Sequence, residues 1–240
     1  KRLLVEQKDV SLETQLPIRL DIAMYKKGLY KETDKMSDLI CENYPMVLVM
    51  SRFGIALGFG EKSIGEVCRQ NGVDANTFLT VVNFLTGEVQ GLTDEVSSAL
   101  SLETLIRYLH NAHDYFLAFR LPNMRRKLNE AISTCPEDVA FVIRRFFDEY
   151  AEEVNKHMTY EASDKYNISI FRKRHEQIDQ KLSDLKNILI KYYPGEGGHL
   201  LNSVLFDLFT TEEDLVSHSL VEDNLFVPSI VWYENKVLNR

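Results

Sequence analysis

The chain has 240 residues, enough for one or two domains with a sizeable hydrophobic core. Hydrophobic residues make up 45%, with only 11 glycines and 6 prolines, which is typical of an ordered and mostly helical protein. The formal net charge of -8 argues against a nucleic-acid partner, and no uninterrupted apolar run is long enough to span a bilayer. The three scattered cysteines form no disulfide framework, so we expect a reducing, cytoplasmic setting.

The N-terminal third predicts a group of short helices. Ser63 and Asp74 precede apolar runs as helix caps, and Gly72 closes the first of these runs. A polar stretch with two glycines follows and predicts a linker. We therefore divide the chain into an N-terminal extension, a small helical domain, a linker and a C-terminal helical domain: residues 1–32, 33–86, 87–100 and 101–240.

The C-terminal domain carries apolar residues at helical spacing in four long segments, which are residues 102–120, 136–162, 170–192 and 200–225. Proline lacks an N–H group and clashes with the preceding turn. We therefore expect Pro122 to end or interrupt the first helix, and Pro228 to end or kink the last. The predicted fold class is all-α, an up-down four-helix bundle with a small N-terminal helical domain.

A pattern of histidines and glutamates repeats in this domain. Each unit holds a lone histidine, followed 44 or 43 residues later by a His-x-x-x-Glu segment. Side chains four residues apart share one helix face, and all six residues continue the apolar stripes of their helices. The six candidate metal ligands are His113, His157 and Glu161 in the first unit, and His175, His218 and Glu222 in the second.

The chemistry of these side chains indicates a dinuclear metal site. Two ionised carboxylates in a bundle core are costly unless they are compensated, and no Lys or Arg lies near them on the same stripes. Four imidazoles and two carboxylates suffice for two ions, with a glutamate from each half free to bridge them. Iron, manganese or zinc fit a donor set without thiolate. The ferritin-like alternative requires Glu-x-x-His helices, and this spacing occurs only in the glycine turn at 196–199.

The segments HDYFLAFRLP, HMTYE, RHEQIDQKL and HSLVEDNLFVP resemble the four metal-binding helices of the hemerythrin-like HHE domain. They are similar in particular to the di-iron iron–sulfur-cluster repair family (RIC, or ScdA-type), over about residues 102–228. The six candidate ligands occupy the ligand positions of that family. One extra residue between His113 and Pro122 leaves His110 as an alternative ligand, although His113 has the better helical phase.

The resemblance implies a centre of two non-haem iron ions bridged by carboxylate and by oxo or hydroxo, with manganese or zinc as alternatives. It also implies a role in oxidative and nitrosative stress, with damaged iron–sulfur proteins, dioxygen or nitric oxide as partners. By resemblance alone, we expect a homodimer formed through the small domain. It identifies no catalytic residue, and it leaves open whether the protein is an enzyme.

The small domain resembles the N-terminal ScdA-like domain of the same family through KMSDLICENYPMVLVMSRFGI and EKSIGEVCRQNGVD. The family usually carries a vicinal Cys-Cys pair after a Phe-Gly-Ile-Asp turn, and both cysteines are absent here, where Ala56-Leu57-Gly58-Phe59-Gly60 follows Phe53-Gly54-Ile55. We therefore expect no thiol chemistry in this turn. Two alternatives stay open beside cluster repair: a module that binds or senses oxygen or nitric oxide without turnover, and a scaffold with a structural metal.

Overall fold

The computed structural model describes residues 28–87, 98–160, 168–195 and 198–238, and most of the predicted extension and linker lie outside these ranges. The described residues contain helices and turns and no β-strand, so the predicted all-α fold is confirmed. The elements are α1 (Met36–Glu42), α2 (Met46–Arg52), α3 (Ile64–Gln70), α4 (Ala75–Leu85), α6 (Leu102–Asp114), η1 (Tyr115–Arg120), α7 (Leu121–Ala131), α8 (Glu137–Tyr160), α9 (Ile168–Lys191), α10 (His199–Val221), η2 (Glu222–Phe226) and α11 (Val227–Leu238).

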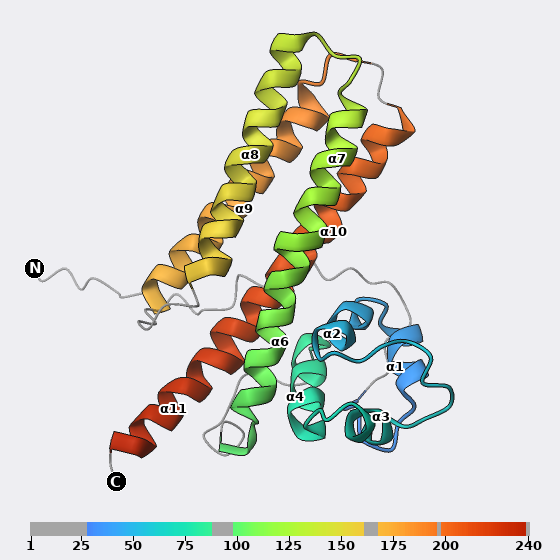
Figure 1. Cartoon of the computed structure of the whole chain (residues 1–240), viewed down its shortest axis with the longest axis vertical. Helices are drawn as coiled ribbons and strands as arrows, with labels where there is room; N and C mark the ends of the chain where they lie inside the picture. Colours follow the sequence, from blue (N-terminus) through green and yellow to red (C-terminus); the bar gives the residue numbers. More distant parts are fainter. Residues whose placement is uncertain (1–27, 88–97, 161–167, 196–197, 239–240) are drawn as a thin grey trace, which may run out of the picture.

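Four long helical rods form the bundle (Figure 1). The first rod, α6–η1–α7, runs the length of the molecule, and α8 returns beside α9. The last rod, α10–η2–α11, runs back alongside the first, so the chain follows an up-down-up-down path. In the part of the chain that the structure describes, no helix is both long and apolar enough to cross a bilayer.

Neither Pro122 nor Pro228 ends its helix, so the first of the two alternatives expected at each proline does not occur. Each proline is the second residue after a π-helical turn, in which hydrogen bonds reach five residues back instead of four. Leu121 N–H donates to Phe116 C=O, and Val227 N–H donates to Glu222 C=O. Proline would remove a hydrogen bond to the residue four positions back, but the π turn has already replaced this pattern at that place. The helices therefore continue to Ala131 and Leu238.

Two clusters of buried apolar side chains hold the fold together. The lower cluster joins the N-terminal unit (α1–α4) to α6 and to the η2–α11 junction, and it includes Leu109 and Val221. The upper cluster fills the bundle between α7, α8, α9 and α10, and it includes Phe116, Met158 and Leu215. On α6–η1 and α10 the boundary between the two clusters falls between Leu109 and Phe116 and between Leu215 and Val221. The predicted histidines lie at this boundary.

The N-terminal unit packs directly on the bundle through α2 and α6. Phe53, at the end of α2, is 1% exposed and lies 5.1 Å from the Phe78 ring and 4.8 Å from the Tyr108 ring. Asn111 on α6 donates a hydrogen bond of 2.7 Å from Nδ2 to the Arg52 carbonyl. The unit and the bundle therefore share one continuous core at this end of the molecule.

We expect Phe53→Ala to lower the free energy of unfolding by about 3–5 kcal/mol, because it leaves a cavity between the unit and the bundle. Leu57→Ala is the matched control, since Leu57 is 68% exposed in the following turn, and its cost should stay within about 0.5 kcal/mol. Chemical unfolding followed by circular dichroism measures both. Equal effects of the two substitutions would contradict the shared core.

Candidate metal centre

Five of the six predicted ligands lie in the described residues, and each stands near one level of the bundle. His113 is the penultimate residue of α6, His157 lies in the last turn of α8, and His175 lies two turns into α9. His218 lies in the last turn of α10, and Glu222 is the first residue of η2. Glu161 follows the end of α8 and lies outside the described residues.

The cluster is enclosed. His157 is 1% exposed, and His218 and Glu222 are 0% exposed. His175 retains 11% exposure of its side chain, and His113 is partly buried. His110, the alternative ligand, points to the surface with 73% exposure and pairs with Asp114 at 3.4 Å. The geometry therefore favours His113 over His110.

Three donor atoms form a compact triangle. His175 Nε2 lies 3.2 Å from both His157 Nε2 and Glu222 Oε2, and His157 Nε2 lies 3.4 Å from the same oxygen. Metal–ligand bonds of about 2.0–2.2 Å place neighbouring donors about 3–3.5 Å apart. The triangle therefore has the dimensions of one face of a coordination polyhedron.

The remaining imidazoles, those of His113 and His218, form a second pair near Glu222. The rings of His113 and His218 lie 5.1 Å apart, and those of His157 and His175 lie 4.6 Å apart. His218 Nε2 is 3.9 Å from Glu222 Oε2, beyond hydrogen-bond distance. Both ring nitrogens of His218 are buried and make no hydrogen bond to any described residue. A buried polar atom of this kind is costly unless a ligand satisfies it, so this donor set fits a metal cation.

Burial and nearby charges shift the pKa values of three of the histidines in different directions. Burial lowers the pKa of His113 to about 4 and that of His218 well below its usual value, so both rings are neutral donors. Burial also disfavours the charged form of His175, but its contacts with Asp223 and Glu222 outweigh this effect and raise its pKa to about 9. A metal ion must therefore displace a proton from His175 at neutral pH.

Three charged residues near the cluster were not identified from the sequence. Asp223 Oδ2 lies 3.5 Å from His175 Nδ1, the ring nitrogen that points away from Glu222. A carboxylate in this position fixes the tautomer and orientation of a ligating imidazole. The other two are Arg52 and Asp214, a nearly buried ion pair with a distance of 2.7 Å. Asp214 lies one helical turn before His218, so its position on the same helix face could have been predicted from the sequence. Nothing local in the sequence pointed to Arg52.

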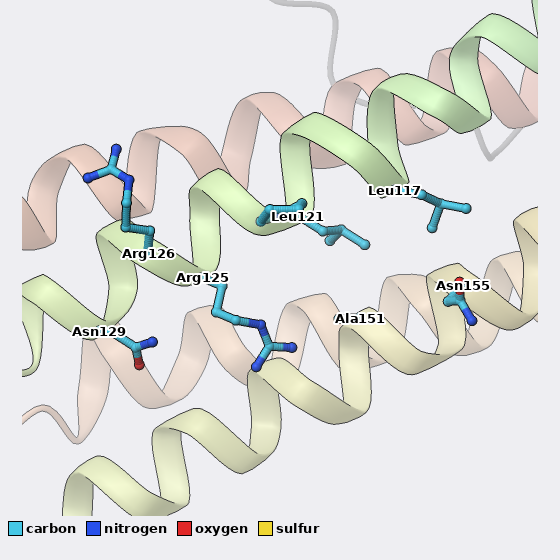
Figure 2. A pocket seen from close by; sticks show the side chains of 8 residues that line it. Leu117, Leu121, Arg125, Arg126, Asn129, Ala151 and Asn155 are labelled. Carbon is cyan, nitrogen blue, oxygen red and sulfur yellow. The ribbon is translucent and has the colours of Figure 1, made fainter.

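A surface groove of about 540 Å³ runs between α7 and α8, and Figure 2 shows its lining. Leu117 and Asn155 lie at one end, and Arg126 and Asn129 lie at the other. None of the five predicted ligands that the structure describes lines the groove. The groove is therefore a feature of the bundle surface separate from the enclosed cluster.

A helical bundle that encloses a cluster of imidazoles and a carboxylate defines a metal-binding protein by its geometry. One ligand atom from each of His157, His218 and Glu222 lies within 4.8 Å of the other two. Residues 104–230 match the family Hemerythrin HHE cation binding domain. The match covers more than half of the chain and all six predicted ligands, and the chain belongs to this family. No curated protein matches the sequence.

We expect Glu222→Ala to weaken metal binding by more than about 100-fold, because the substitution removes the carboxylate that both imidazole pairs approach. His110→Ala is the matched control at an exposed histidine of the same helix and should keep the metal content of the parent protein. Metal analysis of both purified variants decides the assignment. Equal metal content in the two variants would contradict it.

Metal affinity should also depend on pH through His175. Because the raised pKa leaves His175 protonated in the metal-free protein at neutral pH, Co²⁺ affinity should rise about tenfold per pH unit up to about pH 9. Removal of the neighbouring charge by Asp223→Asn should make this dependence shallower above pH 7. Absorbance titrations of the metal-free protein with Co²⁺ at several pH values measure both slopes. A Co²⁺ affinity that does not change with pH in the parent protein would contradict the displacement of a proton from His175.

Proposed function

We propose that this protein is a non-haem di-iron protein whose two ions are held by four histidines and two glutamates. The ligands are His113, His157, Glu161, His175, His218 and Glu222. The observation that carries the proposal is the arrangement of two imidazole pairs around one buried carboxylate. Manganese and zinc fit the same donors and are distinguished by metal analysis.

Iron at this site would supply one-electron redox chemistry and the capacity to bind small electron-rich molecules. The residues around the cluster determine how much water and what size of molecule can reach the site. His157, His218 and Glu222 are closed to solvent, so bulk water is excluded from most of the cluster. The remaining exposure at His175 is small, which favours a diatomic ligand such as dioxygen or nitric oxide over a larger substrate.

Within this class, we infer a role in the response to oxidative and nitrosative stress, through the repair of damaged iron–sulfur clusters. The resemblance of both units to the repair family, in the same order along the chain, supports this role. The close packing of the N-terminal unit on the bundle is consistent with a joint action of the two units. The partners would be damaged iron–sulfur proteins.

A second candidate function is oxygen or nitric oxide binding and sensing without turnover. The specific observation in its favour is the lack of an available thiol in the N-terminal turn. Leu57 lies exposed where the repair family carries a cysteine. Cys41 lies outside this turn on α1, and Cys68 is buried, which raises its pKa to about 12. Thiolate chemistry of the kind expected from cysteines in this turn is therefore disfavoured.

The decisive experiment uses the iron-loaded protein with a damaged iron–sulfur enzyme and, separately, with nitric oxide. Repair predicts that enzyme activity returns in proportion to the di-iron protein added, whereas sensing predicts a reversible spectral change with nitric oxide or oxygen and no recovery. The Glu222→Ala variant is the control for both and should do neither. A protein with two irons that gives no recovery and no spectral change would contradict both functions and leave a structural metal.

A further inference from the structure

The N-terminal unit inserts a positive charge into the interior next to the metal cluster. Arg52, the last residue of α2, is 3% exposed although it carries a guanidinium group, and Asp214 on α10 is 9% exposed. The guanidinium Nη2 lies 2.7 Å from the Asp214 carboxylate. Arg52 stays charged because burial, which lowers its pKa, is offset by the contact with the Asp214 carboxylate, and arginine is protonated throughout the neutral range. A charge is thus held in a site where solvent screening is weak.

Aromatic rings surround the Arg52 guanidinium on the side of the cluster. The Arg52 guanidinium carbon lies 5.2 Å from the centre of the Phe116 ring, and it also faces Tyr115 at 5.8 Å. The Phe116 ring in turn lies 5.9 Å from the His218 ring. The Phe116 ring therefore lies close to both the guanidinium and the imidazole. Burial is the main cause of the lowered pKa of His113 and His218, and the charge of Arg52 adds to it in both.

The opposite half of the cluster has the opposite charge beside it. Asp223 Oδ2 lies 3.5 Å from His175 Nδ1, on the side of the His157 and His175 pair. The two imidazole pairs therefore share Glu222 but differ in the fixed charge behind them. A positive charge disfavours additional positive charge nearby, and a negative charge favours it.

We propose that Arg52 is a positioning residue that makes the two metal positions unequal. It favours the less charged ion at the position held by His113 and His218. The inference rests on the proposed dinuclear iron function. With two irons held at these ligands, an electron supplied by an external one-electron reductant would be favoured at the position held by His113 and His218, because Arg52 disfavours positive charge there. The N-terminal unit would thereby raise the first reduction potential of the centre.

The test exploits the fact that Arg52 and Asp214 form one ion pair with opposite charges. Arg52→Gln removes the positive charge closest to the centre, so the first reduction potential should fall. Asp214→Asn leaves the positive charge uncompensated, so the same potential should rise. We expect about a tenfold change in the equilibrium constant in each direction, which equals about 59 mV for one electron. Potentiometric titration of the iron-loaded full chain, followed by its absorbance, measures the shifts.

A purely structural ion pair would behave differently, because both substitutions would break the same contact and disturb the site in the same direction. Arg52→Lys keeps the charge and should restore the parent potential, which keeps the test valid if Arg52→Gln fails to fold. Arg125→Gln breaks an exposed ion pair with Asp148 on the bundle surface and should leave the potential unchanged. Shifts of the same sign in Arg52→Gln and Asp214→Asn, or no shift in either, would overturn the inference.

The iron content separates this failure from a failure of the proposed function. If the parent protein holds two irons with a measurable reduction and only the pattern of shifts is wrong, the role of Arg52 is refuted and the dinuclear centre stands. If the parent protein does not hold two irons, the dinuclear function and the role of Arg52 fall together.

Discussion

The structure depends on one constraint, which is the placement of a carboxylate and several imidazoles between two apolar cores. Glu222 has no exposed surface, yet it lies within 3.4 Å of two histidines from different helices. Burial of such groups is costly unless every partner is in position, so the apolar packing above and below must hold the four helices in register. The upper cluster and the lower cluster supply that packing from opposite sides.

The π turns follow from the same constraint. Both occur where a ligand-bearing helix passes the cluster, and both precede a proline. A turn that bonds five residues back adds about one residue, and therefore about 100°, to the winding of the helix. The apolar stripe beyond the turn consequently faces a new direction. In the first rod this allows α6 to pack on the N-terminal unit while α7 packs on the upper bundle core.

The sequence predicted the elements that depend on local periodicity, and it missed those that depend on long-range contact. The 3–4 spacing placed His157, His218 and Glu222 on the buried faces of their helices, and the structure finds all three buried. Of the alternatives expected at Pro122 and Pro228, the helix end was wrong, because the rule for proline assumes an α-helical turn and each proline follows a π turn. Arg52 was missed because its partner Asp214 is 162 residues away, and no local pattern encodes such a pair.

This contact changes the meaning of the N-terminal unit. Considered as sequence, the unit differs from the repair family by the absence of the cysteine pair that the family carries after its Phe-Gly-Ile-Asp turn. Considered as structure, it contributes most of the lower cluster and a buried guanidinium that lies near Phe116, the ring that also lies near His218. Its surface turn carries no thiol, but its interior face packs against α6 and places Arg52 beside Phe116. The unit and the bundle are therefore joined at α2 and α6 by one shared core.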